Sequence, residues 1–437
     1  MNRLVITGGT LYGCDGGGER RGAVLIEGGQ IVDIVAEVPS GFREAPELDA
    51  EGAWVVPGFI CLRSHVGEPG FEWREDVASV SLAAASGGFT TVCATPDTDP
   101  VNDVRAVTEQ IMTRAAAAPG ARVVPVGAAT RGLEGKHLSE IGDLAAAGCV
   151  AVSTGELAVA SAQMMRRILE YCRSLDVRVF ACSVDASMAR GALMNEGFQS
   201  LRLGLPGVPS EAEATAILRD GWLSRLAGWP VHFQRVSSAA GVRALEILQR
   251  EGIPFTADCT PHHLWFSDEA VSGYDTATKV LPPLRCREDV SALREALRAG
   301  LITAVATDHA PRSQLEKWVE YDHASAGTTG LETALGVVLE LVRQRVLTLQ
   351  EGLQRLSAGP ARVLGRPDLG RLGSGARADV VLVDPDVPWR VDGAHLRTRG
   401  QNHLFEGQAL SGTVRNTVVG GRVVSFEGAE GVKRAYR

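Results

Sequence analysis

The chain has 437 residues, of which 45% are hydrophobic and 22% are charged, and its formal net charge is -8. This composition is typical of a globular protein, and the acidic balance argues against a nucleic-acid partner, which would require a basic surface. No apolar run approaches the ~20 residues that span a bilayer, and the N-terminus shows no signal-peptide pattern. Eight cysteines lie scattered without a C-x-x-C pair, which predicts reduced thiols in a cytoplasmic protein.

Both ends of the chain consist of short β-rich runs punctuated by glycine. The runs LVITGGTLY, GAVLIEGGQIVDIVA and GAWVVPG lie near the N-terminus, and RADVVLVDPD and GTVRNTVVGGRVVSF lie near the C-terminus. Strand runs separated by Gly pairs indicate hairpins. We therefore expect residues 1–56 and 366–437 to form one small β-sandwich domain.

Between these ends, over residues 57–365, apolar strand-like runs alternate with helical runs such as 103–118, 160–175, 241–252 and 289–300. Eight strands alternating with helices predict an α/β fold, a (β/α)8 TIM barrel. A doubly wound open sheet is the alternative, but no G-x-G-x-x-G follows the first strand to favour it. The predicted strands are 59–65, 90–95, 122–128, 149–154, 177–183, 231–237, 254–259 and 302–309.

Polar residues follow several of these strands, at the end of the barrel where such folds place their chemistry. In the stretch ICLRSHVGEP, Arg63 stands two residues before His65, where a metal site would require a second histidine. The residues at the strand ends are Arg63, His65, Asp97, Thr154, Cys182, Arg235, Asp308 and His309.

These residues allow two interpretations. Zinc accepts three or four ligands of this kind, and a site would then consist of His65, Cys182, Asp308 and His309. Arg63 and Arg235 oppose this interpretation, because a guanidinium has no lone pair and its charge repels a dication. The alternative is that Arg63 or Arg235 forms an ion pair with Asp308 and fills the barrel mouth as structure.

Cys182 and a pair of adjacent histidines are the other candidate functional residues. Cys182 is a nucleophile only if a base or a positive neighbour stabilises its thiolate, and a buried strand-end thiol is the simpler interpretation. His262 and His263 lie in CTPHHLWF. Adjacent residues at a strand end point in opposite directions, so these two cannot both bind one metal ion, and we expect them to be structural.

Motifs along essentially the whole chain resemble those of dihydroorotases of the amidohydrolase superfamily. PGFICLRSHVGEPGFEWREDV is similar to P-G-F-[IV]-D-x-H-x-H-x-R-x-P-G-x-x-x-K-E-D, and AAASGGFTTVCATPDTDPVND is similar to A-A-A-x-G-G-F-T-T-V-x-x-M-P-N-T-x-P. MNEG, TPHHL, KVLPPLR, ATDHAP, GLETAL and the tail GRLGSGARADVVLVDPD also resemble family landmarks. The resemblance implies a (β/α)8 barrel with a β-sandwich built from both termini.

The resemblance also implies a site for two zinc ions. The family holds them with the H-x-H pair, an aspartate or carbamylated lysine after strand four, histidines after strands five and six, and an aspartate after strand eight. Only His65 and Asp308 keep their residue type here, and Asp308 corresponds to the family's general base. In chain order the corresponding positions are Arg63, His65, Thr154, Cys182, Arg235 and Asp308.

The positions that contact substrate in the family differ as well. The arginine that binds the substrate carboxylate corresponds to Gly67, and the asparagine of M-P-N-T corresponds to Asp97. The asparagine of K-x-N-P-P-L-R corresponds to Leu281, and the histidine after D-H-A-P corresponds to Arg312. The resemblance therefore implies a changed substrate site.

Two remaining ligands cannot hold two zinc ions between two arginines, so we expect metal-dependent hydrolysis to be lost. The chain is then predicted to be no enzyme, with no cofactor and with Asp308 as a vestigial base. The resemblance implies a structural subunit for the aspartate transcarbamoylase catalytic chain in pyrimidine biosynthesis, within a homo- or hetero-oligomer. One alternative is a dihydroorotase or related cyclic-amide hydrolase with a degenerate or single-metal site on His65, Asp308 and Cys182. The other is an anion sensor that uses Arg63 and Arg235.

Overall fold

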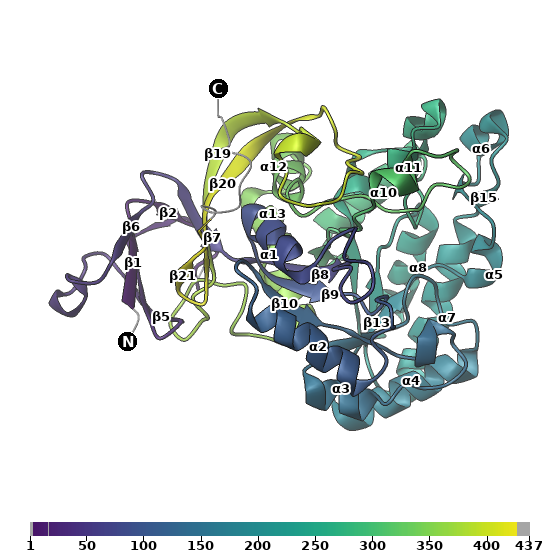
Figure 1. Cartoon of the computed structure of the whole chain (residues 1–437), viewed down its shortest axis with the longest axis horizontal. Coiled ribbons are helices and arrows are strands. Elements are labelled where there is room, and N and C mark those ends of the chain that lie inside the picture. The colour runs from purple at the N-terminus through teal and green to yellow at the C-terminus, as the bar shows by residue number, and fades with distance from the viewer. Residues whose placement is uncertain (1–2, 16, 426–437) are drawn as a thin grey trace.

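The computed structural model describes residues 3–15 and 17–425 and has two parts, a β domain beside a larger barrel (Figure 1). The β domain contains two sheets, with strand orders β5-β4-β1-β6 and β21-β20-β19-β7-β2-β3. The first sheet comprises β1 (Arg3–Thr7), β4 (Ala23–Glu27), β5 (Gln30–Val35) and β6 (Glu47–Asp49). The second comprises β2 (Thr10–Leu11), β3 (Arg20–Arg21), β7 (Trp54–Pro57), β19 (Val380–Arg390), β20 (Ala409–Val419) and β21 (Arg422–Val423).

The two ends of the chain meet in the second sheet. β7 pairs antiparallel with β19, with Trp54 opposite Val383 and Pro57 opposite Val380. Apolar side chains of both sheets, among them Ile26 and Leu382, share one buried cluster. Because each sheet buries one apolar face against the other, the predicted β domain built from both termini is confirmed. The exact domain boundaries, 56/57 and 365/366, stay predictions.

The barrel consists of parallel strands in the orders β10-β9-β8 and β11-β12-β13-β16-β17-β18. A bridge between Ser64 and His309 closes the ring, since it joins the first strand to the segment after the last one. The (β/α)8 barrel is therefore confirmed. Its strands are β8 (Phe59–Ser64), β9 (Phe89–Ala94), β10 (Arg122–Pro125) continued by β11 (Gly127–Ala128), β12 (Ala151–Ser153), β13 (Arg178–Cys182), β16 (Val231–Gln234), β17 (Phe255–Cys259) and β18 (Ala304–Val305).

Helices surround the barrel and bury one apolar stripe each. In α4, Met165, Ile168, Leu169 and Cys172 recur at helical spacing and are buried. The Asp76 carboxylate accepts a hydrogen bond from the Ser79 N–H at 2.7 Å and begins α1. The longer helices are α1 (Val77–Ser86), α2 (Arg105–Ala116), α3 (Ile141–Ala147), α4 (Ala162–Leu175), α7 (Glu211–Ala227), α8 (Ala239–Arg250), α10 (Arg287–Arg298), α12 (Ala334–Arg343), α13 (Leu349–Leu356) and α14 (Ala358–Leu364).

Short elements lie mainly in the connections at the carboxyl ends of the strands. One of them corrects a prediction: His262 and His263 lie in a helix, α9, rather than at a strand end. The short elements are α5 (Ala186–Ala189), β14 (Met194–Asn195), α6 (Phe198–Leu203), β15 (Gly207–Val208), α9 (Pro261–Trp265) and α11 (Gln314–Lys317). Within the described ranges, no helix is long and apolar enough to cross a membrane.

Two polar residues beyond the carboxyl ends of barrel strands have left-handed backbone conformation. Arg235, directly after β16, has φ +58°, and Asp308, after β18, has φ +47°. Left-handed backbone is unfavourable for residues other than glycine and occurs mainly where the surrounding contacts impose it. These two residues therefore mark the carboxyl end of the barrel as the place where side-chain contacts dominate local preference.

Candidate active site

Two fully buried arginines occupy the mouth of the barrel. Arg63, on β8, and Arg235 each have side chains that are only 1% exposed. Arg63 Nε donates to Asp308 Oδ1 at 2.8 Å, as the sequence led us to expect. Arg63 Nη1 donates to Gln234 Oε1 at 3.2 Å, and Nη2 donates to Glu156 Oε1. All three nitrogens of the Arg63 guanidinium are therefore engaged within the protein.

Arg235 makes a parallel set of contacts. Its Nη1 lies 2.8 Å from Glu156 Oε2 and 3.6 Å from Asp308 Oδ2. The same Nη1 donates to the carbonyl of Leu281 at 2.6 Å, and Nη2 contacts Cys182 Sγ at 3.3 Å. Both terminal nitrogens of Arg235 are used within the protein, and its Nε is buried without a partner. Because the guanidinium groups of Arg63 and Arg235 are buried against carboxylates, the structure gives no support to the expectation that they serve as an anion sensor.

The charges of this network stabilise one another. Burial alone would raise the pKa of Asp308, but Arg235 and Arg63 outweigh it and hold the pKa well below its usual range. Glu156 behaves in the same way: burial opposes ionisation, and the two arginines lower its pKa. Burial and mutual repulsion oppose the charge of Arg63, yet Glu156 and Asp308 raise its pKa. The mouth therefore holds permanently ionised groups in close contact.

His65 lies at the edge of this network, between two carboxylates. Its Nδ1 is 2.6 Å from Asp97 Oδ2, and its Nε2 is 3.4 Å from Glu156 Oε1. Burial alone would raise the pKa of Asp97, but the charge of His65 and their hydrogen bond bring it well below its usual range. Ligand atoms of these three residues lie within 4.8 Å of one another. Sequence reasoning missed Glu156, although the letters STGE place an acid two residues after Thr154.

The donors at the mouth do not fit two zinc ions. Guanidinium nitrogens stand at two of the family's ligand positions and offer no lone pair. Thr154 Oγ1 accepts a hydrogen bond from the Cys182 N–H at 2.9 Å, and Cys182 Sγ donates to the Glu156 carbonyl at 2.7 Å. Thr154 and Cys182 are therefore engaged in hydrogen bonds within the protein rather than directed at a metal ion.

Two of the donors that remain have the spacing of ligands to one divalent ion, although Glu156 Oε1 also accepts a hydrogen bond from Arg63 Nη2. Two ligands that lie about 2.1 Å from one ion at a tetrahedral angle are separated by about 3.4 Å. His65 Nε2 and Glu156 Oε1 are 3.4 Å apart. Asp97 then orients the histidine through Nδ1, the usual role of a carboxylate behind a metal-binding histidine. The group differs from the expected single-metal set, because Asp97 and Glu156 replace Asp308 and Cys182.

The four-residue metal set considered from the sequence is not brought together. Among the described residues, the group with metal-ligand spacing includes His65 but none of its expected companions. His309 is held elsewhere: its Nε2 lies 3.4 Å from the buried Glu75, and its Nδ1 accepts from the Gly330 N–H at 3.2 Å. Asp308 Oδ1 accepts from Arg63 Nε, and within the described part of the chain these four side chains do not form one ligand group.

The histidine pair of α9 is buried. His263 Nδ1 contacts Thr260 Oγ1 at 2.8 Å, and its Nε2 lies 3.0 Å from the Pro282 carbonyl. The two rings lie 4.5 Å apart. Burial lowers the pKa of His262 to about 4, so this ring is neutral at neutral pH. The contacts of His263 agree with the structural role expected for it.

The positions that contact substrate in the family separate in space. Gly67, Asp97 and Arg312 line one cavity of about 10 Å³, together with His65 and Arg74. This volume is about that of one water molecule. Leu281 is not among the residues around this cavity and offers its carbonyl to Arg235. The mouth is therefore nearly filled by the protein's own side chains.

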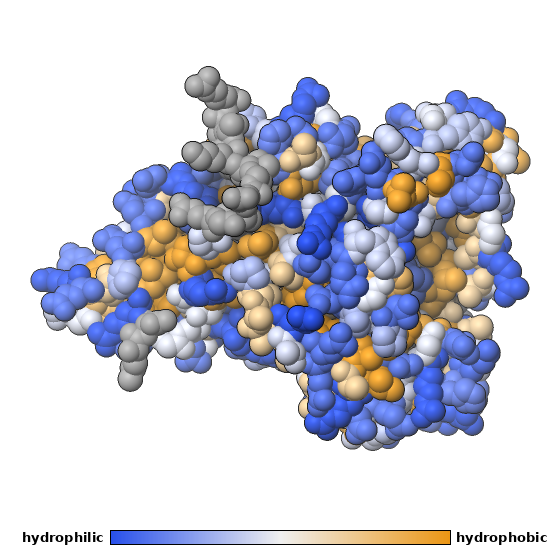
Figure 2. All heavy atoms as spheres, viewed as in Figure 1, coloured by the Kyte–Doolittle hydropathy of each residue, from blue (hydrophilic) through white to orange (hydrophobic). Residues whose placement is uncertain are grey.

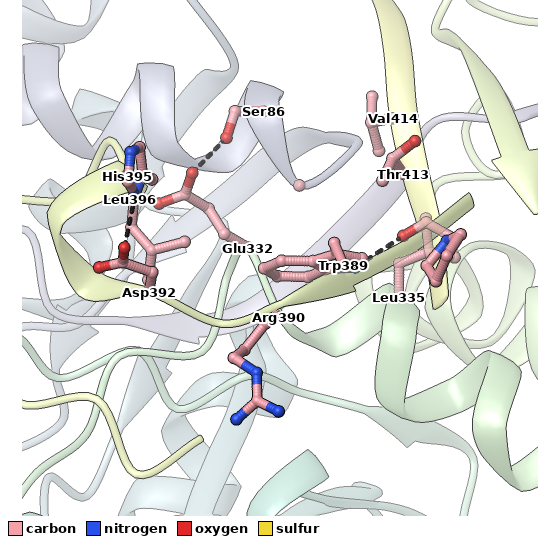
Figure 3. Close-up of a pocket in the computed structure, with 13 residues that line it drawn as sticks. Ser86, Glu332, Leu335, Trp389, Arg390, Asp392, His395, Leu396, Thr413 and Val414 are labelled. Atoms are coloured by element: carbon pink, nitrogen blue, oxygen red, sulfur yellow. Dashed lines mark hydrogen bonds and ion pairs between the residues drawn. The ribbon is translucent and has the colours of Figure 1, made fainter. Parts of the chain in front are cut away.

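A larger cavity of about 320 Å³ lies away from the mouth, between the ends of α1 and α12 and the β19–β20 pair (Figure 3). Trp389, Leu335 and Val414 form apolar walls, and the Glu332 carboxylate lies between them and the His395–Asp392 pair. None of the residues singled out in the sequence lines this cavity. The candidate site therefore remains the barrel mouth.

Comparison with known proteins shows which families the chain resembles. A dihydro-orotase-like family model matches residues 52–240, and an amidohydrolase family model matches residues 244–425. A dihydroorotase from Anaeromyxobacter dehalogenans (strain 2CP-C) is 46% identical over 427 residues, which cover 97% of this chain and 98% of the relative. A dihydroorotase from Syntrophus aciditrophicus is 43% identical, covering 92% of this chain and 95% of the relative.

Solved structures support the fold. The L-hydantoinase of Arthrobacter aurescens has a TM-score of 0.87 at 24% identity, covering 99% of this chain and 98% of its own. A D-hydantoinase from a Bacillus sp. has a TM-score of 0.83 at 22% identity, covering 96% of this chain and 95% of its own. At these identities, the similarity supports the fold alone.

The expectation that the chain is not an enzyme is contradicted. Relatives that share more than two fifths of its residues over nearly the full length are dihydroorotases, and the mouth retains a metal-ligand group in His65, Asp97 and Glu156. The expectation failed because it counted ligands only at the family's strand-end positions and overlooked Glu156. With this full-length similarity and the shared barrel, the chain belongs to the dihydroorotase family of the amidohydrolase superfamily.

Proposed function

We propose that this chain catalyses the dihydroorotase reaction of pyrimidine biosynthesis, the reversible opening of a six-membered cyclic amide, with one divalent metal ion rather than two. The observation that carries the proposal is the 46% identity to a dihydroorotase over 97% of the chain. The cluster of His65, Asp97 and Glu156, whose ligand atoms lie within 4.8 Å of one another at the barrel mouth, supports it. A bound ion would polarise the amide carbonyl and activate water.

The residues of the chain take distinct roles in this proposal. His65 Nε2 and Glu156 Oε1 would hold the ion, and Asp97 fixes the histidine ring through Nδ1. Arg63 and Arg235 fix Glu156 and Asp308 in place. Asp308 Oδ2, which lies 3.6 Å from Arg235, is the proton acceptor.

The same network limits the rate. Two arginines hold the pKa of Asp308 well below its usual range, and a base is most effective when its pKa lies near the working pH. Arg63 also lies against Glu156 and repels a dication at that carboxylate. We therefore expect slow turnover and a weakly held metal that is lost during purification.

The test is an assay of carbamoyl aspartate cyclisation and dihydroorotate hydrolysis with zinc, cobalt or manganese added to metal-free protein. Turnover that rises with metal and disappears in Asp97→Asn supports the proposal. The exposed variant Asp386→Asn serves as the control, since its carboxylate is 95% exposed. Absence of turnover at every metal concentration, with protein that unfolds cooperatively, contradicts it.

We also propose that the chain assembles with an aspartate transcarbamoylase catalytic chain. The support is a set of exposed apolar side chains on α6, on α11 and directly after α11, which are unusual on the surface of a monomer. Figure 2 shows hydrophobic residues near α11 on this face. The set consists of Phe198 (75% exposed), Leu201 (85%), Leu315 (83%) and Trp318 (79%). Co-purification that is lost in Leu201→Glu and Trp318→Glu supports the proposal, and unchanged co-purification contradicts it.

A further inference from the structure

The residue that follows Asp308 is fixed on both sides by neighbouring segments. Asp308 has φ +47°, a left-handed conformation that residues other than glycine adopt mainly where surrounding contacts impose it. The next carbonyl, that of His309, accepts a hydrogen bond from the His65 N–H at 2.8 Å. Bridges pair His309 with Ser64 on one side and with Thr328 on the other. The backbone at Asp308 is therefore constrained by the contacts of its neighbour.

The ring of His309 has a defined orientation as well. Its Nδ1 lies 3.2 Å from the backbone nitrogen of Gly330. A backbone N–H only donates, so Nδ1 is the acceptor, and the proton of a neutral ring lies on Nε2. Nε2 is 3.4 Å from Glu75 Oε2 and 3.5 Å from Thr398 Oγ1. The ring therefore donates its proton toward the Glu75 carboxylate.

Glu75 is fully buried, and hydrogen-bond donors surround its carboxylate. Thr398 Oγ1 donates to Oε2, and Ser79 Oγ donates to Oε1. The Arg399 N–H also donates to Oε2, at 3.2 Å. Hydrogen bonds between such donors and a carboxylate are stronger than those between neutral groups. Glu75 is therefore a fixed anchor for the His309 ring.

This anchor joins three segments that are distant in the chain. Glu75 lies just before α1, His309 follows β18, and Thr398 lies between β19 and β20. The segment that contains Thr398 also contacts the loop after β18 directly, because Asn402 Nδ2 donates to the Ala310 carbonyl at 2.9 Å. A segment near the C-terminal strands is therefore held against the loop that follows Asp308.

We propose that Glu75 is a positioning residue for the proposed reaction, and that it acts through the His309 ring to keep the Asp308 carboxylate directed into the barrel mouth. The Thr398 hydroxyl holds the Glu75 carboxylate in place. The inference rests on the proposed function, because Asp308 is the proton acceptor there. A misplaced base transfers protons more slowly, whereas substrate binding changes little.

The first experiment measures kcat and KM for dihydroorotate hydrolysis by the full chain with added metal. Glu75→Gln places an amide NH2 group among donors, and Thr398→Val removes one donor while keeping the shape of the side chain. We expect kcat to fall about ten-fold to 100-fold in Glu75→Gln and about three-fold or more in Thr398→Val, with KM within about two-fold of wild type.

Two further variants separate positioning from a general loss of structure. Thr398→Ser retains the hydroxyl and should restore most of the kcat that Thr398→Val loses. Thr113→Val is the matched control and should leave kcat and KM unchanged. Thr113 is exposed on α2, and its hydroxyl donates to the Glu109 carbonyl within that helix.

Crystal structures of wild type and variants provide a second readout that does not depend on turnover. Arg63 Nε and Asp308 Oδ1 are 2.8 Å apart. We expect this separation to exceed about 3.5 Å in Glu75→Gln, which is beyond the range of a hydrogen bond. It should remain near 2.8 Å in Thr113→Val.

Three outcomes overturn the inference: an unchanged kcat in both Glu75→Gln and Thr398→Val, a kcat loss that Thr398→Ser does not relieve, or a kcat loss with Asp308 unmoved in Glu75→Gln. A wild type without turnover overturns the proposed function alone. The crystal structures then decide the inference, since a displaced Asp308 supports it and an unmoved one contradicts it. If Glu75→Gln does not fold, the comparison of Thr398→Val with Thr398→Ser decides.

Discussion

Arg63 and Asp308 form a buried ion pair across the barrel mouth, with Nε and Oδ1 separated by 2.8 Å. The two residues lie 245 positions apart and join the first strand of the barrel to the segment after the last. In the zinc-binding members that the family motifs imply, a histidine stands at position 63. The resemblance therefore implies that the ion pair lies where zinc-binding members hold a metal, and this can be tested.

Arg63→His should raise the affinity for zinc. The substitution restores the H-x-H spacing beside His65 and removes a charge that repels a dication at Glu156. We expect the metal content of purified protein to rise from substoichiometric toward one ion per chain, as measured by elemental analysis and by competition with a chelator. Arg287→His should leave the metal content unchanged, because Arg287 is exposed and remote from the ligand group. Equal metal contents in wild type and Arg63→His would contradict the expectation that Arg63 weakens metal binding.

Arg63→Met should destabilise the protein strongly. It leaves Asp308 and Glu156 with Arg235 as their remaining arginine, and breaking a buried ion pair costs about 3–5 kcal/mol. The free energy of unfolding in urea measures this cost. Arg287→Met, which removes an exposed ion pair, should produce no measurable change. A wild-type-like stability for Arg63→Met would show that the mouth tolerates the loss of this pair.

Acidification should remove stability that Asp97 supplies. The folded protein holds the pKa of Asp97 below its unfolded value, which is about 3.9. A carboxylate of this kind stabilises the fold above the unfolded pKa, and that stability is lost as pH falls through the folded pKa. Urea unfolding between pH 7 and pH 3 should therefore show a shallower acid loss in Asp97→Asn than in wild type. Asp386→Asn should follow the wild-type curve.

Gly67→Ala should destabilise the loop after β8. The new Cβ would meet the Glu75 carbonyl oxygen at 2.3 Å, and the left-handed backbone adds strain of about 1–3 kcal/mol. Gly52→Ala is the control, because Gly52 also has positive φ, at +84°, but no atom lies within 4 Å of its Cβ position. Thermal unfolding should show a larger loss for Gly67→Ala than for Gly52→Ala. Equal losses would mean that the loop moves aside at little cost.

Much of the fold follows from local patterns in the sequence. The alternation of apolar strands with amphipathic helices such as α4 gives the barrel, because each periodicity fixes which face is buried. The glycine-punctuated runs at both ends give the β domain. Arg63 and Arg235 could be placed at the mouth from the sequence, since strand ends are readable from hydrophobic runs.

The partners of these arginines were decided only by the tertiary structure. Glu156 lies 93 residues from Arg63 and on a loop, and no periodicity directs its carboxylate toward both arginines and His65. Asp97 likewise pairs with His65 because two strand-end loops converge at the mouth. Sequence therefore determined which residue types stand near the barrel mouth. The packing of the loops, which fixes distances between side chains from distant segments, decided that His65, Asp97 and Glu156 form a candidate metal-ligand group there.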